Sequence, residues 1–301
     1  DDRFSTARGG AGDSPALRYS HPEWFCDAVR DEFGDDRLLD ILRWNNTTPR
    51  QYARLRVPLD ACREDIAAGR LAPAPEFGGN VVRILSTSEV LQSRSFDTGK
   101  FYLQQPWSIR TAAALPVRDG MRILDMCAAP GGKSLALADA ADVRVVAADS
   151  HPARLLRIYD NLTRICSHRV FPVLMDGRHA HAVFGDNAFD AILLDAPCSS
   201  LGVIQRHPAI RWRVTPENIA MLASLQGVLL ADAARVLRPG GRLLYSVCTF
   251  LAAETTDVIS SFLASRPDFL CEKTERMLPG EEGYDGGFIA CVRRKGDSST
   301  I

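Results

Sequence analysis

From about residue 121, short apolar segments typical of strands alternate with longer segments typical of helices. The strand-like segments read MRILDMC, VRVVAAD, RVFPVLMD, FDAILLDAP and RLLYSVCT. This alternation predicts an α/β fold, a doubly wound and mostly parallel sheet with helices on both faces. Ligand sites in such sheets lie beyond the carboxyl ends of the strands. We therefore look for functional residues where these segments end.

The rest of the chain divides by composition. Residues 1–16 are rich in Gly, Ser and charge without apolar periodicity, which predicts a disordered tail. Residues 17–98 predict a small α/β module, with two helices broken near Gly34 and strands over 52–59 and 81–85. The large domain is expected over 99–296, and 297–301 are a second tail.

The composition is that of an ordinary globular protein. The net charge is −1, which gives no global attraction to RNA, so clustered arginines are either a local basic face or simply a solvated surface. No apolar stretch approaches the length of a membrane span and no signal peptide is evident, so a cytoplasmic location without membrane contact is expected. Eight scattered cysteines without paired spacing predict reduced thiols and no metal site.

The strand ends carry acids and a glycine-containing loop. Gly131 and Gly132 allow a ligand to approach the backbone closely, but neither GxGxxG nor GxxxxGK[ST] is present, which disfavours a nicotinamide dehydrogenase. Asp149, Asp176 and Asp195 follow three further strands, although each acid taken singly could be only a turn or cap residue. Acids at successive strand ends suit a ligand with a ribose, an amine and a positive sulfur, which indicates S-adenosylmethionine.

Two cysteines, Cys198 and Cys248, end strands that are neighbours in the usual doubly wound order. A thiolate there has a chemical use, because its addition to carbon 6 of a pyrimidine makes carbon 5 nucleophilic enough to accept a methyl group. A cation such as Lys133 favours the ionised thiol. Buried structural cysteines are the alternative for any one thiol, and we assign to that class Cys26, Cys62, Cys166, Cys271 and Cys291.

The segments that carry a family resemblance are LDMCAAPGGKS, LLDAPCSSLGVIQRHPAIRW and LLYSVCTF, together with GKFYLQQPWS and LPGEEGYDGGFIACVRRK. In these segments the chain resembles the RNA cytosine-5 methyltransferases of the Sun (Fmu, RsmB-like) family. The resemblance covers roughly residues 20–295. It implies a Rossmann-like methyltransferase fold with a seven-stranded sheet. It also implies that Cys248 is the nucleophile and that Cys198 assists release of the product, with Asp195 and Lys133 beside them. DNA cytosine-5 methyltransferases use a Pro-Cys thiol as nucleophile, so chemistry alone would have favoured Cys198.

The resemblance further implies which residues hold S-adenosylmethionine: Cys127, Ala128, Ala129, Pro130, Gly131, Gly132, Lys133, Asp149, Asp176 and Asp195. The chain departs from the family pattern at Val247, Thr249 and Gln105, none of which removes a catalytic group. Long bacterial members carry an additional helical domain of the NusB type at the amino end, which is not contained in this sequence.

RNA is the implied partner, and the sequence names no protein partner. Small-subunit (16S) ribosomal RNA is the expected substrate, with transfer RNA and a catalytically silent assembly factor as alternatives. The phosphate-contact candidates are Arg50, Arg54, Arg56, Lys100, Arg206 and His207. Phe101, Tyr102 and Trp107 either stack on a splayed base or pack between the two modules.

Overall fold

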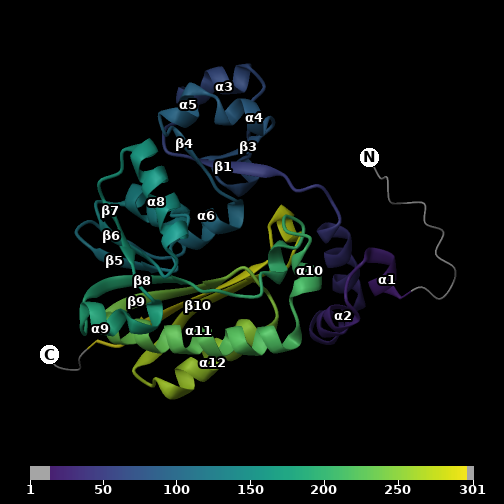
Figure 1. The fold of residues 1–301 in the computed structure, drawn as a ribbon, viewed down its shortest axis with the longest axis vertical. Helices are drawn as coiled ribbons and strands as arrows, with labels where there is room; N and C mark the ends of the chain where they lie inside the picture. Colours follow the sequence, from purple (N-terminus) through teal and green to yellow (C-terminus); the bar gives the residue numbers. More distant parts are fainter. Residues whose placement is uncertain (1–13, 297–301) are drawn as a thin grey trace.

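The computed structural model describes residues 14–296 and contains two sheets (Figure 1). The larger sheet has seven strands in the order β10-β11-β9-β8-β5-β6-β7. Strands β5 to β9 run parallel, and β11 is antiparallel to both of its neighbours. The predicted doubly wound, mostly parallel seven-stranded sheet is confirmed. The calls on the tails at residues 1–13 and 297–301 lie outside the described residues.

The larger sheet and the elements that cover it have the following bounds. The strands are β5 (Arg122–Met126), β6 (Arg144–Asp149), β7 (Val170–Leu174), β8 (Phe189–Asp195), β9 (Leu237–Val247), β10 (Phe269–Met277) and β11 (Gly287–Arg294). The helices are α6 (Pro106–Ala113), α7 (Gly132–Ala140), α8 (Pro152–Ile165), α9 (Ala180–Phe184), α10 (Ile210–Arg213), α11 (Pro216–Val236) and α12 (Thr256–Ser265). Short 3-10 turns are η3 (Gly177–His179), η4 (Leu201–Val203), η5 (Ala252–Glu254) and η6 (Glu281–Gly283).

Successive side chains of a strand point to opposite faces of the sheet, so each face of this sheet has its own apolar core. On one face, Leu124 and Ile192 pack with apolar residues of α9, α11 and α12. On the other face, Ile123 and Leu193 pack with α6, α7 and α8. Strands buried on both faces are necessarily apolar throughout, which is why they read as continuous apolar runs in the sequence.

Helix α11 corrects one sequence expectation. By length and composition alone it is apolar enough to cross a membrane, because its most apolar stretch of 18 residues holds no more than two charged residues. In the structure it lies along the sheet (Figure 1) and buries Leu229, Leu230 and Ala233 in the core. Thr215 caps its first turn by accepting a hydrogen bond from the amide of Asn218.

The smaller sheet has four antiparallel strands in the order β2-β3-β1-β4. Its elements are β1 (Gln51–Leu55), η1 (Leu59–Cys62), α3 (Arg63–Ala67), β2 (Leu71–Pro73), η2 (Pro75–Phe77), β3 (Val81–Ile84), α4 (Thr87–Leu91), α5 (Arg94–Asp97) and β4 (Phe101–Leu103). The expected boundary at residue 98 is wrong, because β4 pairs with β1 and belongs to this sheet. The expected strand over 52–59 ends at Leu55, before Pro58.

Two helices precede the smaller sheet and do not belong to its core. They are α1 (Pro15–Tyr19), which begins inside the expected tail, and α2 (Glu23–Asn45), which is kinked at Gly34 as predicted. Phe25, Ile41 and Leu42 pack against Leu201 and Phe250, which follow β8 and β9. The expected module 17–98 therefore contains two units, and the helical one covers the loops that carry the thiols.

Candidate active site

The site lies at the carboxyl ends of β5 and β8. These strands are neighbours, but the chain leaves β5 toward β6 and β7 and leaves β8 toward β9, so the strand order reverses between them. This is the topological switch point at which doubly wound sheets bind their ligands. The loop 127–133 follows β5, and Asp195 ends β8. Among the predicted residues, the switch point brings together Lys133, Asp195 and the two thiols.

The loop after β5 is held in a fixed shape by packing against α8 and β4. Gly131 has a φ of 99°, which a side chain would disfavour, and it precedes the first turn of α7. A Cβ on Gly132 would lie 2.8 Å from the ring of Tyr102. The Tyr102 hydroxyl donates to the Pro130 carbonyl over 3.2 Å, and the Asn161 amide donates to both groups. The small sheet thus supports the cofactor loop directly, because Tyr102 lies on β4.

Two of the acids expected to bind cofactor already accept hydrogen bonds. Asp149 is buried and accepts from the amides of Ala129 and His151, so it ties the loop after β5 to the loop after β6. Asp176 accepts from the amide and guanidinium of Arg178 and caps η3. Hydrogen bonds from Arg178 lower the pKa of Asp176. Asp176 is thus a turn and cap residue, which was the alternative interpretation for each acid in the sequence. Its side chain is still about one third exposed.

Lys133 and Asp195 form an ion pair of 2.6 Å at the centre of the site. Burial opposes the charge of Lys133, but Asp195 outweighs burial and raises the pKa of the ammonium group. Behind this pair, Asp125 is fully buried and accepts a hydrogen bond of 2.5 Å from the Ser134 hydroxyl. Burial raises the pKa of Asp125 to about 7. The site therefore holds a fixed cation beside a second acid that is largely relieved of its charge below neutral pH.

The two thiols meet at the adjacent ends of β8 and β9. Their sulfur atoms lie 3.3 Å apart, both are free, and the Ser200 hydroxyl lies 3.3 Å from the sulfur of Cys248. The hydrogen bond from Cys198 lowers the pKa of Cys248, assisted by Ser200 and Lys133. The same hydrogen bond raises the pKa of Cys198. The pair therefore holds its first thiolate on Cys248 and its remaining proton on Cys198.

Other cysteines do not join this pair. Within residues 14–296 no cluster of His, Cys, Asp or Glu side chains could hold a metal ion. Cys26, Cys62 and Cys291 are buried as expected, but Cys166 and Cys271 are exposed, which corrects their assignment as buried structural cysteines. Burial raises the pKa of Cys127 to about 12, so this thiol stays neutral in the cofactor loop.

A buried polar network fixes the loop that carries Cys198. Glu254 is fully buried and accepts hydrogen bonds from the Ser199 amide over 2.9 Å and from the Gln226 side chain over 3.0 Å. Gln226 also donates to the Pro197 carbonyl, and the Ser199 hydroxyl donates to Thr249. Burial raises the pKa of Glu254. The loop segments on both sides of the thiol pair are thereby joined to one another.

Two of the arginines predicted to bind phosphate, Arg54 and Arg56, form ion pairs within the protein instead. Arg54 is buried, and both Arg54 and Arg56 form ion pairs with Asp139 of α7, of 2.8 and 2.9 Å. Arg56 also donates to the carbonyls of Gly99 and Ile165. These contacts join the small sheet to the large domain, so they correct the expectation that Arg54 and Arg56 contact RNA.

The remaining RNA candidates fall into two groups. Arg206 is largely buried and its Nε–H donates to both carboxylate oxygens of Asp285, and the Lys100 ammonium donates to the Ala61 carbonyl. Arg50 and His207 are exposed. The aromatic residues Phe101, Tyr102 and Trp107 are all buried and not available to stack on a base: Phe101 lies in the core of the small sheet, and Tyr102 and Trp107 pack in the core of the large domain.

Sequence reasoning did not find Ser200 and Glu254, and it named Tyr102 without its role at the loop after β5. Ser200 contacts the Cys248 sulfur, Glu254 holds the thiol loop, and Tyr102 supports the cofactor loop. Ser200 lies two residues after Cys198, so its proximity was a usable signal. Glu254 reads in sequence as an ordinary acid at the start of a helix. Nothing in the sequence pairs Tyr102 with Pro130.

Comparison with known proteins decides the family. Residues 112–293, more than half of the chain, match the family model described as 16S rRNA methyltransferase RsmB/F. The chain belongs to the RsmB/F family. Membership confirms the predicted resemblance and the predicted enzyme class, an RNA methyltransferase that depends on S-adenosylmethionine.

Curated relatives of this RsmB/F chain carry the name ribosomal RNA small subunit methyltransferase B. The protein of Proteus mirabilis (strain HI4320) is 33% identical over 284 residues, which cover 92% of this chain and 67% of the relative. The protein of Klebsiella pneumoniae (strain 342) is 35% identical over 285 residues, which cover 91% and 66%. The chain therefore spans about two thirds of the length of these relatives.

Solved structures have the same fold. The crystal structure of PH0851 aligns with a TM-score of 0.88 at 27% identity, over 96% of this RsmB/F chain and 70% of that one. NSun6 from Pyrococcus horikoshii, solved with the S-adenosylmethionine analogue SFG, aligns with a TM-score of 0.80 at 20% identity, over 92% and 99%. The second likeness concerns the fold alone.

Proposed function

We propose that this chain methylates carbon 5 of a cytosine in small-subunit (16S) ribosomal RNA, and that Cys248 forms a covalent bond to carbon 6 during the reaction. The observation that carries the proposal is the thiol pair, with sulfur atoms 3.3 Å apart at the switch point of the sheet. Buried structural thiols have no need of a hydroxyl and an ammonium group close by. A nucleophilic thiol does, because only its ionised form attacks.

The residues of the chain act in a definite order. The Cys248 thiolate adds to carbon 6, which raises the electron density at carbon 5. S-adenosylmethionine, when bound, would supply an electrophilic methyl group, which carbon 5 would accept with S-adenosylhomocysteine as the leaving group. The carbon-5 proton then leaves to water, the bond between sulfur and carbon 6 breaks, and the ring double bond forms again. Cys198 lies 3.3 Å from the departing sulfur and stabilises it as a thiolate by donating a hydrogen bond.

The site fits S-adenosylmethionine through its own residues. The loop 127–133 lies at the carboxyl end of β5, and Gly131 and Gly132 let its backbone pack closely against α8 and β4. Asp149 lies at the end of β6, about twenty residues after the loop, where a ribose is held in related sheets. Asp195 ends β8, the strand beside β5, and the partly exposed Asp176 follows β7, two strands from β5, so the proposed set spans four neighbouring strand ends.

The substrate base must be outside a duplex. Cys248 lies at the bottom of a strand-end site and is only partly exposed, so a stacked and paired cytosine does not reach it. We therefore propose that the target is unpaired or flipped out. Ribosomal RNA meets such an enzyme where ribosomes are assembled, which supports a cytoplasmic location.

Methyl transfer from labelled S-adenosylmethionine tests the proposal. Ribosomal RNA and transfer RNA from a strain without the enzyme are offered separately. We expect 5-methylcytosine in small-subunit ribosomal RNA with the wild type and none with Cys248→Ala. Label in transfer RNA alone would show that the substrate is transfer RNA and not small-subunit ribosomal RNA. Absence of label with RNA still bound would favour a silent assembly factor or a requirement for sequence beyond this chain.

Denaturing gels test the roles of the two thiols in the same reactions. Cys198→Ala should accumulate protein covalently linked to RNA, and Cys248→Ala should form none. Cys166→Ala, which removes an exposed thiol away from the site, is the matched control and should behave as the wild type. The reverse pattern, with an adduct only in Cys248→Ala, would exchange the two roles.

A further inference from the structure

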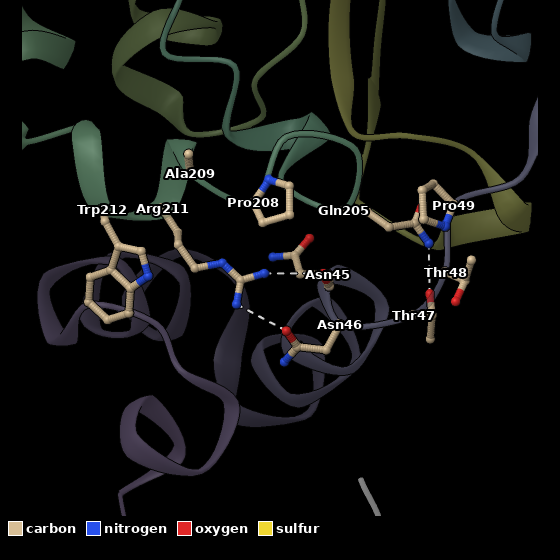
Figure 2. Close-up of a pocket in the computed structure, with 10 residues that line it drawn as sticks. All are labelled: Asn45, Asn46, Thr47, Thr48, Pro49, Gln205, Pro208, Ala209, Arg211 and Trp212. Atoms are coloured by element: carbon tan, nitrogen blue, oxygen red, sulfur yellow. Dashed lines mark hydrogen bonds between the residues drawn. The ribbon is translucent and has the colours of Figure 1, made fainter. Parts of the chain in front are cut away.

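A second concave site lies outside the thiol site, between the end of α2 and the loop before α10 (Figure 2). Its volume is about 510 Å³, which is within the range of ligand pockets. Residues 45–49 form one wall and residues 205–212 the other. Figure 2 shows Trp212 at one end, Thr48 and Pro49 at the other, and Asn45 between them.

Two carboxamide side chains of this pocket each have an oxygen acceptor without a hydrogen-bond partner within residues 14–296. Asn45 and Gln205 are both more than nine-tenths buried, and the side-chain oxygen of each has no hydrogen-bond partner in the described part of the chain. Their amide groups are used, since Asn45 donates to His21 and Gln205 donates to Thr47 over 2.7 Å. Two orphaned acceptors are costly unless something with N–H donors meets them.

The wall beneath Trp212 is rigid. Arg211 is buried, and its guanidinium donates to the Ser20 carbonyl over 3.1 Å, to the Asn46 side chain over 3.0 Å and to the Asn45 carbonyl over 3.2 Å. These bonds fix the short helix α10 on α2. The neighbouring Trp212 is nevertheless 61% exposed. A large aromatic ring on a fixed support, with one face open, is a platform on which a nucleobase can stack.

The rim of the pocket is positively charged. Arg50 follows Pro49, His207 precedes Pro208 and Arg213 follows Trp212, and all three side chains are exposed. Within residues 14–296 none of the three has a carboxylate within 4.0 Å, in contrast to Arg54, Arg56 and Arg206. Two exposed arginines without acidic partners, Arg50 and Arg213, beside an aromatic platform match the contacts that single-stranded RNA makes.

The pocket is physically connected to the thiol site. Gln205 follows Cys198 by seven residues along one loop, and the amide of Gly202 in between donates to the Cys248 carbonyl over 3.0 Å. An RNA strand whose cytosine enters the thiol site therefore has its neighbouring nucleotides close to this loop.

We propose that this pocket binds an unpaired base adjacent to the target cytosine in the RNA strand, stacked on Trp212. The oxygens of Asn45 and Gln205 accept hydrogen bonds from N–H groups on the edge of that base. Arg50 and Arg213 contact the phosphates beside it. This inference rests on the proposed function, because it names a second subsite for the same RNA.

The test uses the full chain and small-subunit ribosomal RNA transcribed in vitro. Trp212→Ala removes the platform, Trp212→Phe keeps an aromatic ring, and Tyr159→Ala removes an exposed aromatic residue of α8 as the control. Filter binding gives the Kd for RNA, and methyl transfer gives KM and kcat. We expect Trp212→Ala to raise Kd and KM for RNA about 5- to 100-fold, the effect of losing one base stack. Trp212→Phe should recover most of this loss.

The expected kcat at saturating RNA and the Kd for S-adenosylmethionine are unchanged in all three variants. If Trp212→Ala binds RNA as tightly as Tyr159→Ala does, the pocket is not a base site and the inference is overturned, while wild-type methyl transfer still upholds the proposed function. If the wild type binds RNA without methylating it, the proposed function fails, and filter binding still decides the role of Trp212.

Discussion

Replacing Cys198 with alanine should slow the alkylation of Cys248 by iodoacetamide at neutral pH. The two sulfur atoms lie 3.3 Å apart, and the hydrogen bond from Cys198 is the main cause of the lowered pKa of Cys248. A hydrogen bond to a charged group contributes about 1.5–3 kcal/mol, and the lower end applies because a thiol is a weak donor. Loss of that stabilisation reduces the thiolate population, and hence the alkylation rate, about 10-fold.

The assay is a time course of alkylation followed by mass spectrometry of each cysteine peptide. Exposed Cys166 reacts in the same tube and serves as the internal reference. Because the pKa of Cys248 rises in Cys198→Ala, its reaction should recover at higher pH, whereas Cys198→Ser should show a smaller loss because it keeps a donor. The reasoning would be refuted if Cys198 reacts before Cys248 in the wild type, or if the ratio of Cys248 to Cys166 is the same in Cys198→Ala.

Three further outcomes concern stability and loop geometry. Burial lowers the pKa of His21 to about 4, below its ordinary 6.5. The free energy of unfolding measured in urea should therefore fall by about 3 kcal/mol as the pH is lowered from 6.5 toward 4. His21→Gln should flatten that pH dependence. Asp139→Asn should destabilise the fold by about 3–5 kcal/mol in the same assay, because it leaves two guanidinium groups without a counter-charge. Gly202→Ala should cut methyl transfer on the order of 100-fold, since its Cβ would lie 2.1 Å from the Gly286 carbonyl oxygen, and an unchanged rate would show that the thiol loop tolerates displacement.

The sequence was most informative where strand order determines proximity. Cys198 and Cys248 are fifty residues apart, yet the rule that successive parallel strands lie side by side predicted that their sulfur atoms face one site, and β8 does pair with β9. The same alternation of strands and helices predicted a ligand site beyond the carboxyl ends of the strands, but the reversal of strand order between β5 and β8 is seen only in the fold. Their chemical roles rest on the resemblance and stay predictions.

The sequence was least informative about which partner each charge has. Arg54 and Arg56 read as a basic segment, but Asp139, which pairs with both, lies more than eighty residues away on α7. Apolar periodicity likewise showed that residues 23–45 are helical without showing what they cover, because a helix face records burial and not the identity of the neighbour. Contacts of this kind depend on the assembled fold.

The attachment of the small sheet to the large domain has a consequence for how RNA is selected. Asp139 binds two arginines from β1 and the turn after it, the ring of Phe96 stacks with the guanidinium of Arg164, and Tyr102 contacts the cofactor loop. These contacts hold β1, α5 and β4 against α7, α8 and the loop after β5, so moving the small sheet toward a substrate would require breaking the ion pairs of Asp139. A small sheet held in this way does not pull a base out of an RNA duplex by closing over it. For the proposed reaction, we therefore expect a cytosine that is already unpaired to be methylated faster than a paired one.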